Sequence, residues 1–168
     1  MTKDVALIVG GGPGISASCA RLFAKSGMQV AIAARTPDKP ALQNLERMHG
    51  VRRYACDASE PAAVELLFQN VVRDLGAPRL VVHNIDGRVA GIFRKGITEA
   101  DASMALETLR NSAFSAFLVG QQAARLMREN EPSANGARGT IIFTNASAAL
   151  KGFATSGAFA MACQAKSG

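Results

Sequence analysis

The feature that most constrains this chain is a short apolar run that leads directly into a cluster of glycines. Residues 5–9 are all apolar, and Gly10-Gly11-Gly12-Pro13-Gly14 follows them without a break. An alanine-rich segment with helical periodicity comes next, at residues 15–26. Glycine adopts backbone conformations that other residues avoid, so it allows a sharp turn between a strand and a helix. The pattern predicts a β-strand, a tight turn and the first turn of an α-helix.

The same alternation continues to the end of the chain. Short runs rich in β-forming residues occupy residues 5–9, 29–33, 51–55, 80–83 and 140–144, and most of these runs are mainly apolar, as is typical of buried parallel strands. Helices are expected at residues 15–26, 39–48, 61–74 and 100–130, with a last one from Ala158 onward. For the helix at 61–74 we expect Ser59 as the cap and Ala62, Leu66 and Val72 on one apolar face. Right-handed crossovers then give an α/β fold, a doubly wound parallel sheet with helices on both faces.

Length and composition favour one domain spanning residues 1–168. The chain has 168 residues, of which 48% are hydrophobic, which suits one buried core. Residues 1–4 are polar and the apolar run after them stops at Gly10, so we expect no signal peptide, no membrane-spanning helix and a cytoplasmic location. Cys19, Cys56 and Cys163 lie far apart without a C-x-x-C pair. Free buried thiols are therefore expected, with neither a disulfide framework nor a metal site.

The net charge of +6 suits an anionic ligand. The 19 lysines and arginines are dispersed along the chain, however, and one tyrosine with no tryptophan offers little surface for base stacking. Nucleic-acid binding is therefore kept only as a minor alternative to a small anionic ligand.

The glycine turn points to a phosphate-bearing ligand. At such a turn the main chain approaches a pyrophosphate closely, and the free N–H groups and dipole of the following helix stabilise its charge. The residues expected to contact the ligand are Gly10, Gly12, Gly14 and Ile15. Because a strand precedes the glycines and a helix follows them, a dinucleotide site is favoured over a purely structural turn.

The end of the second expected strand indicates which dinucleotide binds. A site that prefers NAD usually offers an acidic residue to the ribose hydroxyls about 20 residues past the glycines. This chain has Ala33-Ala34-Arg35 there. Arg35, helped by Lys39, is suited to pair with a 2′-phosphate, although a solvated arginine at a strand end has the same sequence pattern. We therefore expect NADP(H) in preference to NAD(H).

Several segments together resemble the short-chain dehydrogenase/reductase family. Val9-Gly10-x-x-x-Gly14-Ile15-Ser16 is similar to its Thr-Gly-x-x-x-Gly-Ile-Gly turn, with a serine that we expect to loosen the turn slightly. By this resemblance, Asp57 accepts a hydrogen bond from the adenine amine, and Asn84 is the retained asparagine of an Asn-Asn-Ala-Gly motif in which Asp86 replaces the glycine. Asn111 matches a structural and proton-relay asparagine, with an ordinary surface asparagine as the open alternative.

The resemblance implies a fold, an activity and partners. The fold is expected to be Rossmann-like with strand order 3-2-1-4-5, and the family's last strands are missing because the chain ends at Gly168. Both a truncated product and a natural short form fit this early end. The implied activity is NADP(H)-dependent hydride transfer between a small carbonyl compound and an alcohol. A homo-oligomer, typically a dimer, is implied through the long helix at 100–130, although packing within the monomer explains its apolar residues equally well: Ala113, Phe114, Phe117 and Leu118.

The residues that carry the family's chemistry are replaced in this chain. The family uses a serine at the end of the fifth strand and a Tyr-x-x-x-Lys pair on the next helix, where the lysine lowers the pKa of the tyrosine. Ala146 stands at the serine position, with Ser147 beside it, and Phe159 and Cys163 stand at the tyrosine and lysine positions. Ser147 and Asn111 are therefore the remaining catalytic candidates.

Neighbouring residues are not expected to take over the roles of the missing tyrosine and lysine. Lys166 lies seven residues after Phe159, about two helical turns, so we expect it not to reach the same ribose. No cation lies one turn before Cys163 to lower the pKa of its thiol. We therefore expect an oxidoreductase whose activity is weakened or lost. The alternatives are a noncatalytic NADP(H)-binding or regulatory module and, third, RNA binding by a basic surface.

Overall fold

The computed structural model describes residues 3–168, so Met1 and Thr2 of the polar opening segment lie outside the described residues. Five parallel strands form one sheet in the order β3-β2-β1-β4-β5. The strands are β1 (Val5–Val9), β2 (Gln29–Ala34), β3 (Arg52–Ala55), β4 (Pro78–His83) and β5 (Thr140–Phe143). This confirms the expected strand order, and each strand begins and ends within two residues of its predicted bounds.

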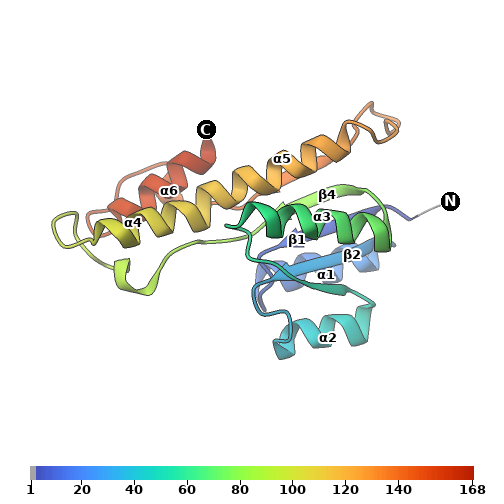
Figure 1. Cartoon of the computed structure of the whole chain (residues 1–168), viewed down its shortest axis with the longest axis horizontal. Coiled ribbons are helices and arrows are strands. Elements are labelled where there is room, and N and C mark those ends of the chain that lie inside the picture. Colours follow the sequence, from blue (N-terminus) through green and yellow to red (C-terminus); the bar gives the residue numbers. More distant parts are fainter. Residues whose placement is uncertain (1–2) are drawn as a thin grey trace.

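Helices cover both faces of the sheet (Figure 1). The helices α1 (Ile15–Lys25) and α2 (Pro40–His49) pack on one face, and α3 (Pro61–Leu75) and α5 (Ser115–Met127) pack on the other. The chain therefore has the doubly wound, Rossmann-like architecture that the alternating pattern predicts. Among residues 3–168, no helix is both long enough and apolar enough to cross a membrane.

The central strand shows why its sequence is continuously apolar. Leu7 and Val9 of β1 pack into the cluster beneath α3 and α5, whereas Ile8 packs into the cluster beneath α1 and α2. All three side chains are at most 1% exposed. Successive residues of a strand point to opposite faces, so covering both faces with helices requires apolar residues at every position.

The predicted helix at 100–130 is interrupted. It consists of α4 (Ala102–Leu109), a π-helical turn η2 (Arg110–Phe114) and α5, which continue one another as a rod in Figure 1. The Ser115 hydroxyl donates a hydrogen bond to the main-chain oxygen of Asn111 at 2.6 Å. It competes for this oxygen with the main-chain N–H groups of the helix, at the place where the π-helical turn lies. The last helix, α6 (Gly157–Ser167), packs beside α4 at the end of the rod that projects from the sheet. Two short 3₁₀ turns complete the fold, η1 (Ala90–Ile92) and η3 (Ser147–Ala149).

Two expectations for α3 were wrong. Glu60, rather than Ser59, occupies the N-cap position, because the Ser59 hydroxyl donates to the carboxylate of Asp57 at 2.8 Å. Leu66 and Val72 are 55% and 37% exposed. The side chains that α3 buries against the sheet belong to the other apolar arc of the helix: Val64, Leu67, Phe68 and Val71. The sequence has apolar residues on both arcs, and only the position of the sheet decides which arc is covered.

Candidate functional site

The turn between β1 and α1 brings Gly10 against the end of β4. Gly10 has a φ of +102°, and a Cβ atom there would collide with the main-chain carbonyl of Asn84. The N–H groups of Gly10 and Gly11 donate to the carbonyl of Ala33 at 3.0 and 2.8 Å. Only glycine combines this backbone conformation with so close an approach. The turn thereby joins the carboxyl ends of β1, β2 and β4.

A chain of side-chain hydrogen bonds fixes this turn. The Thr144 hydroxyl donates to Oδ1 of Asn84 at 2.9 Å, Nδ2 of Asn84 donates to Oγ of Ser16 at 2.7 Å, and the Ser16 hydroxyl donates to the Gly10 carbonyl at 2.7 Å. Ser16 is completely buried. The expectation that Ser16 loosens the turn was therefore wrong, because its hydroxyl ties the turn to the ends of β4 and β5.

Gly12 and Gly14 face open space instead. A Cβ atom on either residue would meet no atom within 4 Å. Helix α1 begins at Ile15 with Gly14 as the N-cap residue, and no side chain caps it. The N–H groups of an uncapped first turn attract anions, and the helix dipole adds to this attraction. The open cradle at Gly12 and Gly14 thus has the shape and polarity that fit a pyrophosphate.

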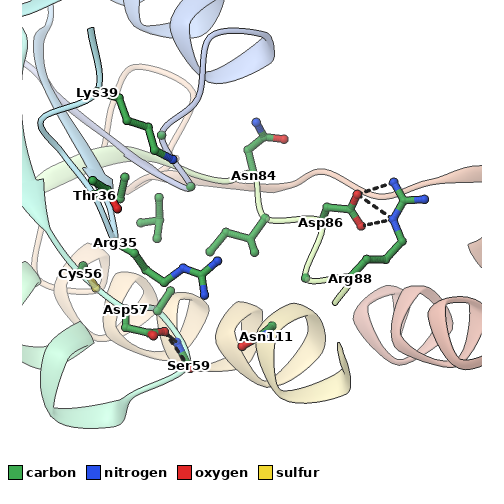
Figure 2. A pocket seen from close by; sticks show the side chains of 17 residues that line it. Arg35, Thr36, Lys39, Cys56, Asp57, Ser59, Asn84, Asp86, Arg88 and Asn111 are labelled. Atoms are coloured by element: carbon green, nitrogen blue, oxygen red, sulfur yellow. Dashed lines mark hydrogen bonds and ion pairs between the residues drawn. The ribbon is translucent and has the colours of Figure 1, made fainter. Parts of the chain in front are cut away.

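A first pocket of about 460 Å³ lies along the carboxyl ends of the strands. The predicted cofactor residues Arg35, Asp57 and Asn84 all line it, together with Lys39 and Asn111. Figure 2 shows Arg35 between Lys39 and Asp57, with its guanidinium directed into the pocket. The sheet brings these side chains together because the carboxyl ends of parallel strands meet at one edge.

Asp57 is held as an anion at the wall of this pocket. Its carboxylate accepts hydrogen bonds from the main-chain N–H of Ser59 at 3.0 Å and from the Ser59 hydroxyl at 2.8 Å. Burial alone would raise the pKa of Asp57, but these hydrogen bonds and the charges of Arg35 and Arg110 lower it below its ordinary value. The carboxylate is therefore a permanent hydrogen-bond acceptor near neutral pH, which suits an exocyclic amine.

Asn111 lies on the π-helical turn and lines the first pocket, not the second. Its main-chain oxygen accepts the Ser115 hydroxyl, which leaves Oγ of Ser115 to accept a hydrogen bond from Nε2 of His83 at 2.8 Å. His83 is completely buried, and burial followed by the charge of Lys166 lowers the pKa of its ring to about 3. The ring is therefore neutral, with the proton on Nε2 and no partner for Nδ1 among the described residues.

A second pocket of about 400 Å³ adjoins the first. The two pockets share Asn84, Ile85, Asp86 and Arg88, so they meet around the end of β4. The second pocket brings together Ala146, Phe159 and Cys163, which stand at the positions of the family's serine, tyrosine and lysine by the resemblance, and Ser147 beside Ala146. Ser147 is exposed at this wall, in the turn η3 that follows β5.

Asp86 and Arg88 form the boundary between the two pockets. Nε of Arg88 donates to both carboxylate oxygens of Asp86 at 2.9 Å, as the dashed lines in Figure 2 show. The guanidinium also lies over the ring of Phe159, 4.4 Å from the ring centroid. A guanidinium stacked on an aromatic face is attracted by the π electrons. The ion pair of Asp86 and Arg88 therefore lies next to Phe159, at the position of the family's tyrosine, and no sequence pattern predicts this contact of Arg88.

Lys166 lines the second pocket, although seven residues separate it from Phe159. Its ammonium donates to the main-chain oxygen of Ile85 at 2.8 Å and to that of Thr144 at 3.5 Å. Seven residues make almost two full helical turns, so Lys166 and Phe159 share a face of α6. The C-terminal part of α6 lies near the carboxyl ends of β4 and β5. Lys166, close to the end of this helix, therefore contacts the residues that follow these two strands.

Cys163 carries a neutral thiol. The side chain is buried, and burial raises its pKa, although the nearby charges of Lys166 and Arg88 and the N–H of Ala146 act in the opposite direction. As expected from the sequence, no cation lies one turn before Cys163 on α6, and a thiolate is disfavoured although Lys166 and Arg88 lie nearby. Within residues 3–168, no group of histidine, cysteine or acidic residues is arranged to hold a metal ion.

Comparison with known proteins shows the family. A family model described as enoyl-(acyl carrier protein) reductase matches residues 10–167. This match covers most of the chain, so the chain belongs to the short-chain dehydrogenase/reductase family of oxidoreductases. Members of this family bind nicotinamide dinucleotides.

Similar curated proteins and solved structures share only part of their length with this chain. An uncharacterized oxidoreductase of Mycobacterium tuberculosis is 33% identical over 91 residues, which cover 48% of this chain and 25% of that protein. An uncharacterized oxidoreductase of Caenorhabditis elegans is 38% identical over 92 residues, which cover 52% and 29%. The chain also superposes on a short-chain dehydrogenase/reductase from Serratia marcescens with a TM-score of 0.80 and 23% identity, over 98% of this chain and 64% of that one. A short-chain dehydrogenase from Streptomyces avermitilis gives a TM-score of 0.83 at 18% identity, over 98% and 57%.

Proposed function

We propose that residues 1–168 form a single domain that binds NADP(H) across the two pockets. The observation that carries this proposal is Arg35, a cation at the carboxyl end of β2 whose guanidinium points into the first pocket beside Lys39. A 2′-phosphate would pair with these two cations, and NAD(H), which lacks that group, would bind more weakly. The pyrophosphate would lie at the cradle, where Gly10 shapes the turn and the main chain at Gly12, Gly14 and Ile15 would bind it.

The remaining cofactor contacts follow from the same edge of the sheet. Asp57 would accept the adenine amine, and Asn84 would hold the turn through Ser16 while it borders both pockets. The nicotinamide half would then lie in the second pocket, since the two pockets meet at Asn84. Asn111 would act structurally, because its main-chain oxygen anchors the π-helical turn beside the first pocket.

The proposed activity is hydride transfer between a small carbonyl compound and an alcohol, at a reduced rate. When bound, the nicotinamide supplies or accepts the hydride. The Ser147 hydroxyl, at the wall of the second pocket, would donate a hydrogen bond to the carbonyl oxygen in place of the hydroxyl that Ala146 lacks. Phe159 has no proton to give, which weakens catalysis.

Phe159 also supports a second candidate function, a noncatalytic NADP(H)-binding or regulatory module. Its ring is covered by Arg88 at 4.4 Å, so the aromatic side chain has a packing role that needs no hydroxyl. Steady NADPH oxidation with carbonyl compounds would exclude this second function, whereas NADPH binding without oxidation would support it.

A homodimer through the rod of α4, η2 and α5 is also proposed. Phe114 and Phe117 are 41% and 59% exposed, and their rings stack with centroids 6.4 Å apart. Leu118 of the same apolar series is buried in the core. Packing within the monomer therefore accounts for Leu118, and the two exposed phenylalanines remain available to a partner copy.

The Arg35→Ala substitution is expected to weaken NADPH binding about 10-fold to 100-fold, because a charge-assisted phosphate contact contributes about 1.5–3 kcal/mol. The affinity for NADH should change little, since NADH has no 2′-phosphate. Calorimetric titration with both cofactors measures the two effects. Arg128→Ala, at the exposed C-terminal end of α5, is the matched control and should bind both cofactors as the wild type does. Equal losses for NADPH and NADH in Arg35→Ala would contradict the assignment.

A further inference from the structure

The ammonium of Lys166 is a hydrogen-bond donor at the wall of the second pocket. Two of its three N–H groups donate to main-chain oxygens, that of Ile85 just after β4 and that of Thr144 just after β5. Among the described residues, no third acceptor forms a hydrogen bond with Nζ. The two carbonyls therefore orient the ammonium at the strand ends and leave one N–H for a molecule in the pocket.

The other groups at this wall are poor proton donors. Phe159 has no acidic hydrogen, and the buried thiol of Cys163 has a raised pKa. Arg88 is paired with Asp86, and a guanidinium keeps its proton at any ordinary pH. Asp86 is the acceptor in this ion pair. Lys166 is thus the one titratable group lining the described pocket that combines an available N–H with a removable proton.

We propose that Lys166 is the proton donor in carbonyl reduction by this chain, in the role that a phenol plays in the family. This inference rests on the proposed NADP(H)-dependent function. As hydride reaches the carbonyl carbon, the C=O π electrons move to the oxygen, an O–H bond forms there, and one N–H bond of Lys166 breaks. The products are the alcohol, the oxidised cofactor and a neutral amine, which regains a proton from water. In alcohol oxidation the same amine accepts the proton.

The surroundings of Lys166 favour this proton transfer. Burial lowers the pKa of the ammonium, while the negative charge of Asp86 acts in the opposite direction. Lys166 in turn lowers the pKa of His83, which lies buried on β4. The charged residues on the elements packed against α6 are Glu107 on α4, which is exposed, and Arg110 on η2, which is paired with Glu60. A lysine with a lowered pKa releases its proton more readily near neutral pH than an exposed lysine does.

The test separates proton donation from cofactor binding by comparing Lys166→Arg with Lys166→Met. Arginine keeps the positive charge and its hydrogen bonds but does not release a proton. We expect Lys166→Arg to bind NADPH within about 3-fold of the wild type while NADPH oxidation falls at least about 100-fold, the range that a general acid contributes. Lys166→Met should lose both affinity and turnover. The substrates are 4-nitrobenzaldehyde, cyclohexanone and diacetyl, and Lys25→Met on the exposed end of α1 is the control.

A second measurement does not depend on turnover. Nitrogen-15 NMR of lysine-labelled protein, assigned with the Lys166→Arg variant, should show Lys166 titrating below the ordinary value of 10.5, and NADPH should shift its signal. The wild-type reduction rate should fall as pH rises through the same pKa. Full turnover in Lys166→Arg, or an ordinary titration of Lys166, would overturn the inference. NADPH binding without any oxidation by the wild type would also overturn it and leave the cofactor site standing, whereas absence of NADPH binding would overturn the proposed function itself.

Discussion

Replacing Gly10 with alanine is expected to lower the free energy of unfolding by roughly 3 to 5 kcal/mol. The added Cβ atom would collide with the main-chain carbonyl of Asn84, and the φ of +102° is unfavourable for any residue with a side chain. Backbone strain and overpacking each contribute about 1–3 kcal/mol. Because the carbonyl belongs to the main chain after β4, rotating a side chain does not relieve the collision. Urea unfolding followed by circular dichroism measures the loss.

Gly50 provides the matched control for this prediction. It ends α2 with a φ of +64°, and a Cβ atom there would meet nothing within 4 Å. Gly50→Ala therefore introduces the left-handed conformation without a collision, and the expected loss is about 1 kcal/mol. Similar losses in the two variants would show that the approach of Gly10 to Asn84 is looser than described.

Acidification from pH 7 to pH 5 is expected to remove about 2 kcal/mol of stability through His83 alone. In the unfolded chain the ring takes up a proton as the pH falls below its ordinary pKa of 6.5, whereas in the folded chain burial lowers the pKa to about 3. The unfolded state therefore binds more protons between these values, so stability is complete above pH 6.5 and falls progressively as the pH drops toward 3. Denaturant titrations at several pH values measure this dependence.

The His83→Gln variant isolates the contribution of His83. Glutamine keeps an N–H donor for Ser115 but does not titrate, so the variant should lose about 2 kcal/mol less than the wild type between pH 7 and pH 5. His49→Gln, at the C-terminal end of α2, is the control and should keep the wild-type dependence. Equal pH dependence in the wild type and His83→Gln would show that His83 does not stay neutral in the folded chain.

Most of the first pocket could be predicted from the sequence, because it depends on topology. A parallel sheet places the residues that follow its strands at one edge, so Arg35 after β2, Asp57 after β3 and Asn84 after β4 had to lie together. The glycine turn was equally predictable, since a glycine cluster between a strand and a helix is typical of a phosphate-binding turn.

The second pocket was less predictable because it depends on loops and on the placement of α6. Counting residues from Phe159 did not show that Lys166 lines this pocket, because its position depends on which end of α6 lies near the strand ends. Arg88 follows β4 in an irregular segment, and its direction is set by Asp86 and by the ring of Phe159. No pattern in the sequence predicts these long-range contacts.

Ser16 shows a different limit of the sequence. A serine in place of the family's glycine suggested a looser turn, but the hydroxyl is buried and bonded on both sides, to Gly10 and to Asn84. Whether a polar side chain crowds a turn or holds it depends on partners that are distant in sequence. In α3 the choice of buried face was likewise decided by the sheet and not by the periodicity of Leu66 and Val72.

Hydrogen–deuterium exchange with and without NADPH shows whether one NADP(H) molecule spans both pockets. A cofactor that spans both pockets should slow exchange in three separate segments: the glycine turn at residues 10–17, the edge residues 35–39, and residues 84–88 where the two pockets meet. Exchange in α3 and α5 away from the pockets should stay unchanged. Protection of all three segments would support a single dinucleotide site. Protection confined to one pocket, or no change with saturating NADPH, would contradict it.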